Sequence, residues 1–552
     1  MIKHKLAKIL EEVVRDAQTK ELLPSIALPE ISLEHPQNPE HGDYASSLPL
    51  KMGRAARTDP LAIARTIVDL LPRIDEVKNV TIAPPGFINF FLTSQWLTEQ
   101  VEHILQAGET YGNMDLGRGL KVQIEFVSVN PTGPIHVGHG RGAVIGSVLA
   151  NLLSATGYSA QKEYYVNDAG SQMEAFYRSI YCRYMQALGR ECEMPANGYQ
   201  GSYPVDIARE IITEKGEAFL AQSPEKAVQE IGRIGLDKTI LTIRSDLELL
   251  GITFDNWFHE HTLFENGQYE RAMALLRKGG YVEEREGAQW FVSTALGEDK
   301  DNVLVRSNRV PTYFASDVAY HYNKFLDRRF DRVINIWGAD HQGHVSRMKS
   351  VIGALGINPE KLRIIIAQMV TLRRGDNVIK LSKRTGELIT LRELVDEVGA
   401  DACRFFFLSR SADSQMDFDL ELAKRESVDN PVYYVQYAHA RIASIQTLAR
   451  ERNIDYSDGN VTLLTSDAEL DLIRKMLLLP ELVELAVTNL EPHHLPYFAQ
   501  DLATSFHCFY KQCRVVSGDE TLTRARLKLV RAAQIALARV LTLMGMTTPD
   551  HM

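Results

Sequence analysis

Two histidines in a glycine-rich turn are the residues of this chain best placed to do chemistry. His136 and His139 lie in the segment PTGPIHVGHG, which follows an apolar run over 122–129 and precedes a stretch rich in Ala, Val, Ile and Leu that ends near Gly157. This order predicts a strand, a tight loop and the start of a helix. Backbone N–H groups and the helix dipole at such a start attract anions, and imidazoles add hydrogen bonds to a phosphate. The segment therefore predicts a site for a nucleotide phosphate.

A basic loop far along the chain is the second candidate for phosphate chemistry. The segment TLRRGDNVIKLSKRTG over 371–386 contains Lys380 and Lys383, and glycines at 375 and 386 bracket its centre. Lysine acts as a mobile point charge, which suits a loop that closes over an anion and opens again. A solvated basic loop without a ligand is the alternative interpretation.

The elements around these segments predict a parallel sheet. Residues 161–166 alternate like a second strand after the helix, and 332–337 form a short buried strand. The sequence GADHQGH over 338–344 follows that last strand, at the edge where open α/β sheets bind ligands. A helix starting near 311 places Tyr313 and Asp317 one turn apart on one face.

The predicted fold class is α/β, with a Rossmann-like parallel-sheet catalytic domain. We expect an N-terminal α+β domain at 1–110, a nucleotide-binding domain at 111–400 with a mainly helical insertion at about 175–300, and an all-α bundle at 401–552. The insertion is expected to separate the two halves of the sheet and to contain the segment 254–260.

Composition narrows the classes of protein. With 45% hydrophobic and 24% charged residues, the 552-residue chain has the make-up of a globular protein, and it contains no apolar run of about 20 residues that would span a bilayer. The five cysteines form no CxxC pair, so the sequence predicts neither a disulfide framework nor a zinc site, but buried thiols in a reducing cytosol. The net charge of −10 does not exclude a nucleic-acid partner, because local patches govern binding.

Both phosphate segments resemble signatures of class I aminoacyl-tRNA synthetases. HVGH at 136–139 resembles the HIGH motif, with Val137 where Ile is commonest. KLSKR at 380–384 resembles KMSKS, with Leu381 replacing Met and Arg384 replacing the last Ser. The segment EFVSVNPTGPIHVGH over 125–139 is similar to bacterial arginyl-tRNA synthetases, and GDYA at 42–45 and GFINF at 86–90 resemble their N-terminal domain. This resemblance covers essentially the whole chain.

The resemblance implies activation of L-arginine with ATP, release of pyrophosphate and transfer of arginine to its tRNA. It also implies an expected cytoplasmic monomer, Mg²⁺ accompanying the phosphates, no zinc, no other metal site, and arginine activation that requires bound tRNA. The implied catalytic residues are His136, His139, Lys380 and Lys383, and the implied ATP-binding residues are Pro134, Gly138, Gly338, Asp340 and Ser382. The arginine-binding residues would be Glu125, Ser128, Asn130, Glu260, Tyr313, Asp317 and either or both of His341 and Gln342. The tRNA-binding residues would be Tyr44, Asn89, Tyr434, Arg441, Tyr510 and Met552.

Within that set, the acids and the tyrosine make physical sense for arginine. Ser128 and Asn130 would hold the amino and carboxylate end of the amino acid, while Asp317 and Glu260 would receive the guanidinium. A planar guanidinium needs a fork of carboxylates and an aromatic wall, which Tyr313 would supply. Surface salt bridges are the alternative for these two acids.

Three other functions remain open from the sequence. A nucleotidyltransferase acting on a small metabolite uses the same HxGH turn, but such enzymes are usually far shorter. A non-catalytic RNA-binding relative would be expected to lack the histidines or lysines, all of which are present. A synthetase for cysteine or glutamate would keep the reaction and change the amino acid, although no zinc-ligand cluster for the cysteine enzyme is visible.

Overall fold

A five-stranded parallel sheet forms the centre of the molecule. The computed structural model describes residues 1–379 and 389–552. The sheet has the order β12-β11-β5-β6-β7, and every neighbouring pair runs parallel. Its strands are β5 (Lys121–Glu125), β6 (Ser159–Val166), β7 (Asn256–His259), β11 (Arg332–Gly338) and β12 (Leu362–Ala367). The sequence expectation of a Rossmann-like sheet is confirmed.

The strand order creates a crevice beside β5. From β5 the chain passes through α5 (Val137–Ala155) to β6 and then β7 on one side, whereas β11 and β12 lie on the other side. The loops after β5 and β11 therefore leave their strands in opposite directions, and open α/β sheets bind ligands at such a switch point. The α5 helix is buried along almost its whole length, because its apolar residues are packed on all sides.

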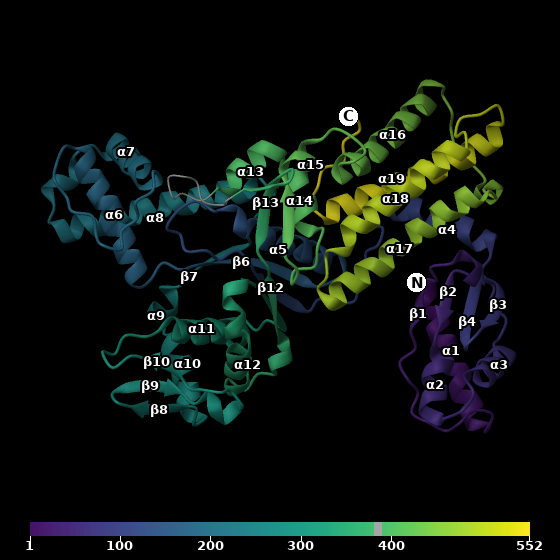
Figure 1. Ribbon diagram of the computed structural model, residues 1–552, viewed down its shortest axis with the longest axis horizontal. Helices are drawn as coiled ribbons and strands as arrows, with labels where there is room; N and C mark the ends of the chain where they lie inside the picture. The colour runs from purple at the N-terminus through teal and green to yellow at the C-terminus, as the bar shows by residue number, and fades with distance from the viewer. Residues whose placement is uncertain (380–388) are drawn as a thin grey trace.

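The segment between β6 and β11 differs from the expected helical insertion. Its first part is helical, with α6 (Ser171–Ala187), α7 (Tyr203–Lys215) and α8 (Pro224–Glu248), which lie together at one end of the molecule in Figure 1. The segment 254–260, however, contains β7, which is the edge strand of the central sheet. After it come α9 (Thr262–Glu265), α10 (Gln268–Lys278) and an antiparallel sheet of β8 (Val282–Arg285), β9 (Ala288–Phe291) and β10 (Asn302–Val305). Strand β7 was missed because its four residues are too few to show a clear alternation.

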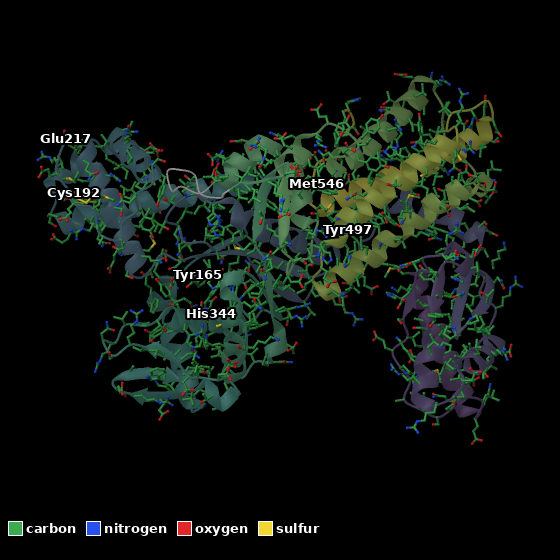
Figure 2. All side chains as sticks on the ribbon, in the orientation of Figure 1. Tyr165, Cys192, Glu217, His344, Tyr497 and Met546 are labelled. Carbon is green, nitrogen blue, oxygen red and sulfur yellow. A yellow bond between two sulfur atoms is a disulfide. The ribbon has the colours of Figure 1, made fainter. Side chains whose placement is uncertain are left out.

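A disulfide joins Cys182 and Cys192, which contradicts the prediction of free thiols. Helix α6 ends at Ala187, and Gly189 in the left-handed region (φ +73°) turns the chain back, so that the two Cα atoms lie 5.1 Å apart. The bridge is visible beside the Cys192 label in Figure 2. Spacing alone did not reveal this return of the chain. Of the other cysteines, Cys403 and Cys513 are buried, whereas Cys508 is exposed.

The N-terminal unit packs against the C-terminal bundle through charged side chains. Arg474 Nε donates to Asp43 Oδ1 at 2.6 Å, and Lys528 Nζ donates to Glu102 Oε1 at 2.6 Å. The unit comprises α1 (Ile2–Thr19), α2 (Leu48–Ala56), α3 (Pro60–Leu70) and a sheet of β1 (Leu33–Glu34), β2 (Tyr44–Ser46), β4 (Phe87–Leu92) and β3 (Val77–Ala83); α4 (Ser94–Ala107) then leads to the catalytic domain. Figure 1 shows the unit hanging below the bundle.

The chain from residue 313 onward forms the remaining layers. Helices α11 (Tyr313–Tyr322) and α12 (Val345–Ala354) flank β11, and β13 (Val370–Arg374), β14 (Asn377–Ile379) and β15 (Met416–Asp419) make a second small sheet. Helices α13 (Leu391–Val398), α14 (Ala400–Leu408) and α15 (Leu420–Lys424) lead into the bundle of α16 (Pro431–Glu451), α17 (Asp467–Asn489), α18 (His494–Gln512) and α19 (Glu520–Leu543). The helical C-terminal bundle is as expected. No helix of the described residues is long and apolar enough to cross a membrane.

Candidate active site

A cavity of about 720 Å³ opens at the carboxyl ends of β5, β6, β7 and β11. Its size is that of a typical small-molecule site. Segments that are distant in sequence meet there: the β5–α5 loop, the ends of β6 and β7, the start of α11 and the turn after β11. The predicted site residues that line it are Glu125, Ser128, Asn130, Pro134, His136, His139, Glu260, Tyr313, Asp317, Gly338, Asp340 and His341.

Some predicted residues do not line this cavity. Gly138 lies behind the histidines, where its N–H donates to Nδ1 of His136 at 3.1 Å. Of the alternatives His341 and Gln342, only His341 lines the wall. Lys380, Ser382 and Lys383 lie outside the described residues.

The imidazoles of His136 and His139 form the first end of the cavity. His136 is the N-cap of α5, and the two ring centroids lie 3.7 Å apart. Burial lowers the pKa of His136, and burial together with the neighbouring His136 lowers the pKa of His139 to about 3. Both rings are therefore neutral at pH 7. Because Nδ1 of His136 accepts the Gly138 N–H, the proton of that ring resides on Nε2, which can donate to an anion.

The opposite end of the cavity holds carboxylates without a full set of counter-ions. Glu260 is only 3% exposed, and burial raises its pKa even though Ser316 and Tyr165 donate hydrogen bonds to it. Its Oε2 atom is buried without a partner. For Asp317, burial and then the charges of Glu125 and Glu260 raise the pKa to about 7. A cation placed between these acids would relieve both desolvation and repulsion.

A buried lysine compensates the third acid of this end. Lys324 is 0% exposed, and its Nζ donates to Glu125 Oε2 at 2.5 Å and to Asn335 Oδ1 at 3.0 Å. The same ammonium lies 4.0 Å from the ring centroid of Tyr320. The charge of Glu125 is thus already paired, whereas Glu260 and Asp317 remain available to a ligand.

The loop between β5 and α5 is strained where it lines the cavity. Val127 and Ser128 have positive φ angles of 69° and 43°, which are unusual for side chains with a Cβ. Hydrogen bonds hold the loop in this shape: Oγ of Ser128 accepts the N–H of Tyr165 at 3.1 Å, and Oδ1 of Asn130 accepts Nδ2 of Asn167 at 3.0 Å. In this shape the polar groups of the loop are directed at one cavity.

Sequence reasoning missed several residues of the cavity wall. Tyr165, Trp337 and His344 line it, and Ser316 lies beside Glu260. The first two lie at the carboxyl ends of β6 and β11, which is the position that could have indicated them. Figure 2 labels Tyr165 and His344 near the centre of the molecule, where these elements converge.

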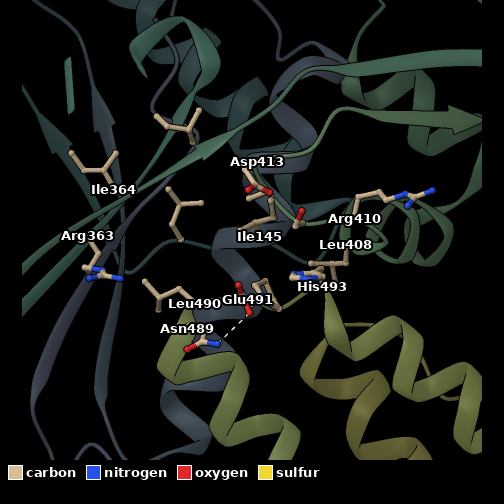
Figure 3. A pocket seen from close by; sticks show the side chains of 15 residues that line it. Ile145, Arg363, Ile364, Leu408, Arg410, Asp413, Asn489, Leu490, Glu491 and His493 are labelled. Carbon is tan, nitrogen blue, oxygen red and sulfur yellow. Dashed lines mark hydrogen bonds between the residues drawn. The ribbon is translucent and has the colours of Figure 1, made fainter. Parts of the chain in front are cut away.

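A second cavity, of about 270 Å³, lies between the sheet and the bundle. Figure 3 shows Arg363 on β12, Arg410 and Asp413 after α14, and His493 beside the loop between α17 and α18. Nδ2 of Asn489 donates to Oε2 of Glu491 at 3.4 Å within it. This cavity shares no residue with the first one and contains none of the predicted site residues.

Two residues predicted to touch tRNA are buried instead. Tyr44 is 3% exposed and donates its hydroxyl to Glu481 Oε1 at 2.6 Å, and Asn89 is 2% exposed within β4. Both side chains are therefore covered by the protein itself, and their contact with tRNA stays a prediction. Tyr44 joins the N-terminal unit to α17, and Asp43 of the same GDYA segment pairs with Arg474 of that helix.

Other residues predicted to contact tRNA meet on the bundle. The guanidinium of Arg441 lies 4.6 Å from the ring centroid of Tyr437 and 5.1 Å from that of Tyr510, which is 39% exposed. Tyr434 lies beside them, with its ring 4.9 Å from that of His507. Met552, at the end of the chain, is exposed. Stacked rings beside a cation are a platform that suits unpaired bases.

Three family models together match most of the chain. Residues 1–92 match the arginyl tRNA synthetase N-terminal domain, 100–419 match the catalytic domain of class I tRNA synthetases (R), and 435–552 match the DALR anticodon-binding domain. The chain belongs to the class I arginyl-tRNA synthetase family. The HVGH turn and the acidic end of the cavity both lie within the segment that matches the catalytic domain.

Individual relatives of this family agree over the full length. The arginine–tRNA ligase of Dehalococcoides mccartyi is 55% identical over 100% of this chain and 99% of its own, and that of Heliobacterium modesticaldum is 48% identical over 95% and 94%. Among solved structures, a putative arginyl-tRNA synthetase from Campylobacter jejuni has a TM-score of 0.77 at 31% identity, covering 84% of this chain and 100% of its own. The arginyl-tRNA synthetase of Thermus thermophilus has the same fold, with a TM-score of 0.79 at 20% identity over 100% of both chains.

Proposed function

We propose that the cavity between β5 and β11 is where this arginine–tRNA ligase joins L-arginine to ATP. The observation that carries the proposal is the buried, under-compensated acidic end formed by Glu260 and Asp317, which lines the same cavity as a neutral imidazole pair. A guanidinium fits the acidic end, a phosphate fits the imidazole end, and a single arginine and ATP can meet between them.

In the first reaction the arginine carboxylate attacks the α-phosphorus of ATP. A new carboxylate O–P bond forms, the bond from that phosphorus to the bridging oxygen breaks, and pyrophosphate leaves. The charge on the phosphate oxygens grows during this step, and His136 and His139 would donate hydrogen bonds to them. Because the imidazoles are neutral, they stabilise the transition state without binding ATP so tightly that it is trapped.

The acidic end would select the amino acid. Asp317 and Glu260 would each accept N–H groups of the guanidinium, which is always charged and forks toward two carboxylates. The Tyr313 ring, which is partly exposed at the rim, would cover the side chain.

Ser128, Asn130 and His341 would face the α-amino and carboxylate end. Lys380 and Lys383, by resemblance, would close over the β- and γ-phosphates.

ATP binding needs a counter-ion as well as side chains. Mg²⁺ would enter with the β- and γ-phosphates, as it commonly does in phosphoryl and nucleotidyl transfer, and Gly338, Asp340 and Pro134 would line the ATP side of the cavity. Asp340 is an exposed carboxylate in the wall of the cavity, and it would face the hydrated Mg²⁺. The residues Gly138 and Ser382 keep their proposed ATP roles through the backbone and the basic loop, respectively.

In the second reaction the 3′-terminal ribose hydroxyl of tRNA attacks the arginyl carbonyl, and AMP leaves. We infer that the Tyr434, Arg441 and Tyr510 cluster and Met552 contact the anticodon arm, because that bundle matches an anticodon-binding domain. The N-terminal unit at 1–110 would touch the tRNA through exposed residues other than Tyr44 and Asn89. We place this activity in the cytoplasm and in a monomer, with domain limits at 111–400 and 401–552.

The test is arginine-dependent exchange of pyrophosphate into ATP, run with and without arginine-specific tRNA and with the other amino acids as controls. The expected result is exchange with arginine only, and only when tRNA is present. Exchange with arginine in the absence of tRNA would support the proposed reaction but would show that activation does not require tRNA. Exchange with another amino acid would overturn the roles of Asp317 and Glu260, and no exchange by folded protein would favour a non-catalytic RNA-binding relative.

A further inference from the structure

The sequence predicted no metal site, but the structure brings three ligating side chains together beside the cavity. Asp168 follows β6, His259 ends β7, and His261 lies two residues further on. One ligand atom from each lies within 4.8 Å of the others. Among residues 1–379 and 389–552, these three form the one group of His, Cys, Asp or Glu side chains close enough to hold a metal ion. The two imidazoles and the carboxylate lie 91 and 93 residues apart in the chain, so spacing did not show them.

Both imidazoles are directed at the same carboxylate oxygen. Nδ1 of His259 and Nδ1 of His261 each lie 2.7 Å from Oδ2 of Asp168. Side chains two positions apart at the end of a strand point to the same side, whereas the residue between them points to the other. Glu260 is that residue, and its carboxylate faces the arginine end of the cavity.

The carboxylate at the centre is buried and receives hydrogen bonds from both imidazoles. The Asp168 side chain is 4% exposed, and among the described residues its ion-pair partners are these two imidazoles. Its other oxygen, Oδ1, accepts only the backbone N–H of His261 at 3.1 Å. A metal ion held by the three ligand atoms would place positive charge beside this buried carboxylate, which a cation stabilises.

We propose that Asp168, His259 and His261 form a binding site for a divalent transition-metal ion of the Zn²⁺ class. Two imidazole nitrogens and one carboxylate oxygen are a ligand set that such ions prefer over Mg²⁺ or Ca²⁺. Ligand distances of about 2.0–2.2 Å require donor atoms roughly 3.3 Å apart in a tetrahedron. The Nδ1–Oδ2 distances of 2.7 Å would therefore open by about half an ångström. The partly exposed rings can turn that far, and water completes the fourth position.

The bound ion would clasp the carboxyl ends of β6 and β7. These strands are neighbours in the sheet, and the N–H of Glu260 already donates to the carbonyl of Val166 at 3.0 Å. Joining Asp168 to His259 and His261 would fix the backbone on both sides of Glu260. The site is independent of the proposed reaction, because no step of that reaction passes through the ion.

The experiment measures metal binding by the full chain without arginine, ATP or tRNA. All variants carry Cys508→Ser, because the exposed Cys508 thiol is a competing ligand. Metal-free protein is titrated with Zn²⁺ by calorimetry and with Co²⁺ by visible absorption. We expect one high-affinity ion per chain, d–d bands typical of tetrahedral Co²⁺, and a higher Tm with Zn²⁺.

The variants locate the site. His259→Gln with His261→Gln should weaken Zn²⁺ binding by more than about a hundredfold and abolish the Tm shift, since loss of an outer partner alone costs about tenfold to a hundredfold. His494→Gln is the matched control, because that imidazole lies 3.3 Å from the Glu491 carboxylate but belongs to no such triad. If the double variant does not fold, His261→Gln alone serves the same purpose.

Two outcomes would overturn the proposal. If the chain that carries Cys508→Ser alone binds no Zn²⁺ above the level of weak surface binding, the three side chains form a hydrogen-bonded triad without metal. Equal binding by the folded histidine variant would place the ion elsewhere. Either result would leave arginine-dependent exchange, and therefore the proposed function, untouched.

Discussion

The two ends of the cavity solve opposite electrostatic problems. At the start of α5, burial keeps His136 and His139 neutral. This end therefore attracts an anion through hydrogen-bond donors and the helix dipole, and not through a full positive charge. At the start of α11, burial and mutual repulsion raise the pKa values of Asp317 and Glu260, so this end is incomplete until a cation arrives. In the function proposed above, the acidic end would therefore set the selectivity for the amino acid, and the imidazole end would set the rate.

The largest expected effect is on stability, and it distinguishes Glu125, which is paired with Lys324, from the unpaired acids of the cavity. Glu125→Gln should lower the free energy of unfolding by about 3–5 kcal/mol, because it leaves the Lys324 ammonium buried without its carboxylate. Urea unfolding followed by circular dichroism measures this loss. Replacing both partners, Glu125→Met with Lys324→Met, should recover most of it, and a single variant as stable as the wild type would show that the pair is not buried as described.

At the imidazole end the expected loss is in rate. His139→Asn should reduce kcat of ATP–pyrophosphate exchange by a hundredfold or more, about 2–4 kcal/mol of transition-state stabilisation, with little change in the KM for arginine. His103→Asn, an exposed histidine on α4, is the control. A rise in the arginine KM without a fall in kcat would contradict the division of labour between the two ends.

Asp317→Asn should act on affinity at the other end. Losing one charge-assisted contact to the guanidinium costs about 1.5–3 kcal/mol, so the Kd for arginine rises by roughly tenfold to a hundredfold. Calorimetry with arginine measures it, and Glu360→Gln, an exposed acid in surface ion pairs, is the matched control. Unchanged arginine affinity with an altered KM for ATP would reverse the assignment of this end.

Much of this site follows from local sequence, but its energetics do not. The HVGH turn and the Tyr313–Asp317 spacing were readable, because a loop-to-helix start and a helical turn are local patterns. The pairing of Glu125 with Lys324 was not readable, because the two residues lie 199 positions apart in the chain. The strand at β7 was not readable either, because it depends on contacts across the sheet. The burial of Tyr44 and Asn89 was not readable for the same reason: the sequence identifies their segment but not the neighbour that buries them.

The two ends should also differ in their response to pH. Asp317, with a pKa of about 7 in the free protein, must lose its proton to receive arginine, so affinity should rise with pH up to that value and level off above it. Below the pKa the slope reaches about tenfold per pH unit, and binding releases protons to the buffer. Calorimetry in buffers of different ionisation enthalpy measures the release.

This pH response has an internal comparison. The groups that face Asp317 and set its pKa are Glu125, Glu260, Arg347 and Lys324. The pKa of His139, near 3, predicts no matching change from this imidazole between pH 5 and 9. Proton release that persists in Asp317→Asn would assign the titration to another group.

The smallest expected effect concerns the aromatic wall. Tyr313→Leu should weaken arginine binding by about 0.5–1 kcal/mol, since the ring is 48% exposed and its cation–π contact is partly solvated. Tyr313→Phe keeps the ring face and should leave the Kd within about twofold. Equal losses in both variants would indicate that the hydroxyl, and not the ring, holds the substrate.

The most direct test of the central claim compares arginine with citrulline, which has the same shape but no charge. The measurement is ATP–pyrophosphate exchange with arginine-specific tRNA present. We predict exchange with arginine and none above background with citrulline, because an uncharged urea group leaves Glu260 and Asp317 uncompensated. Comparable exchange with both amino acids would contradict the account, since the acidic end would then read shape rather than charge.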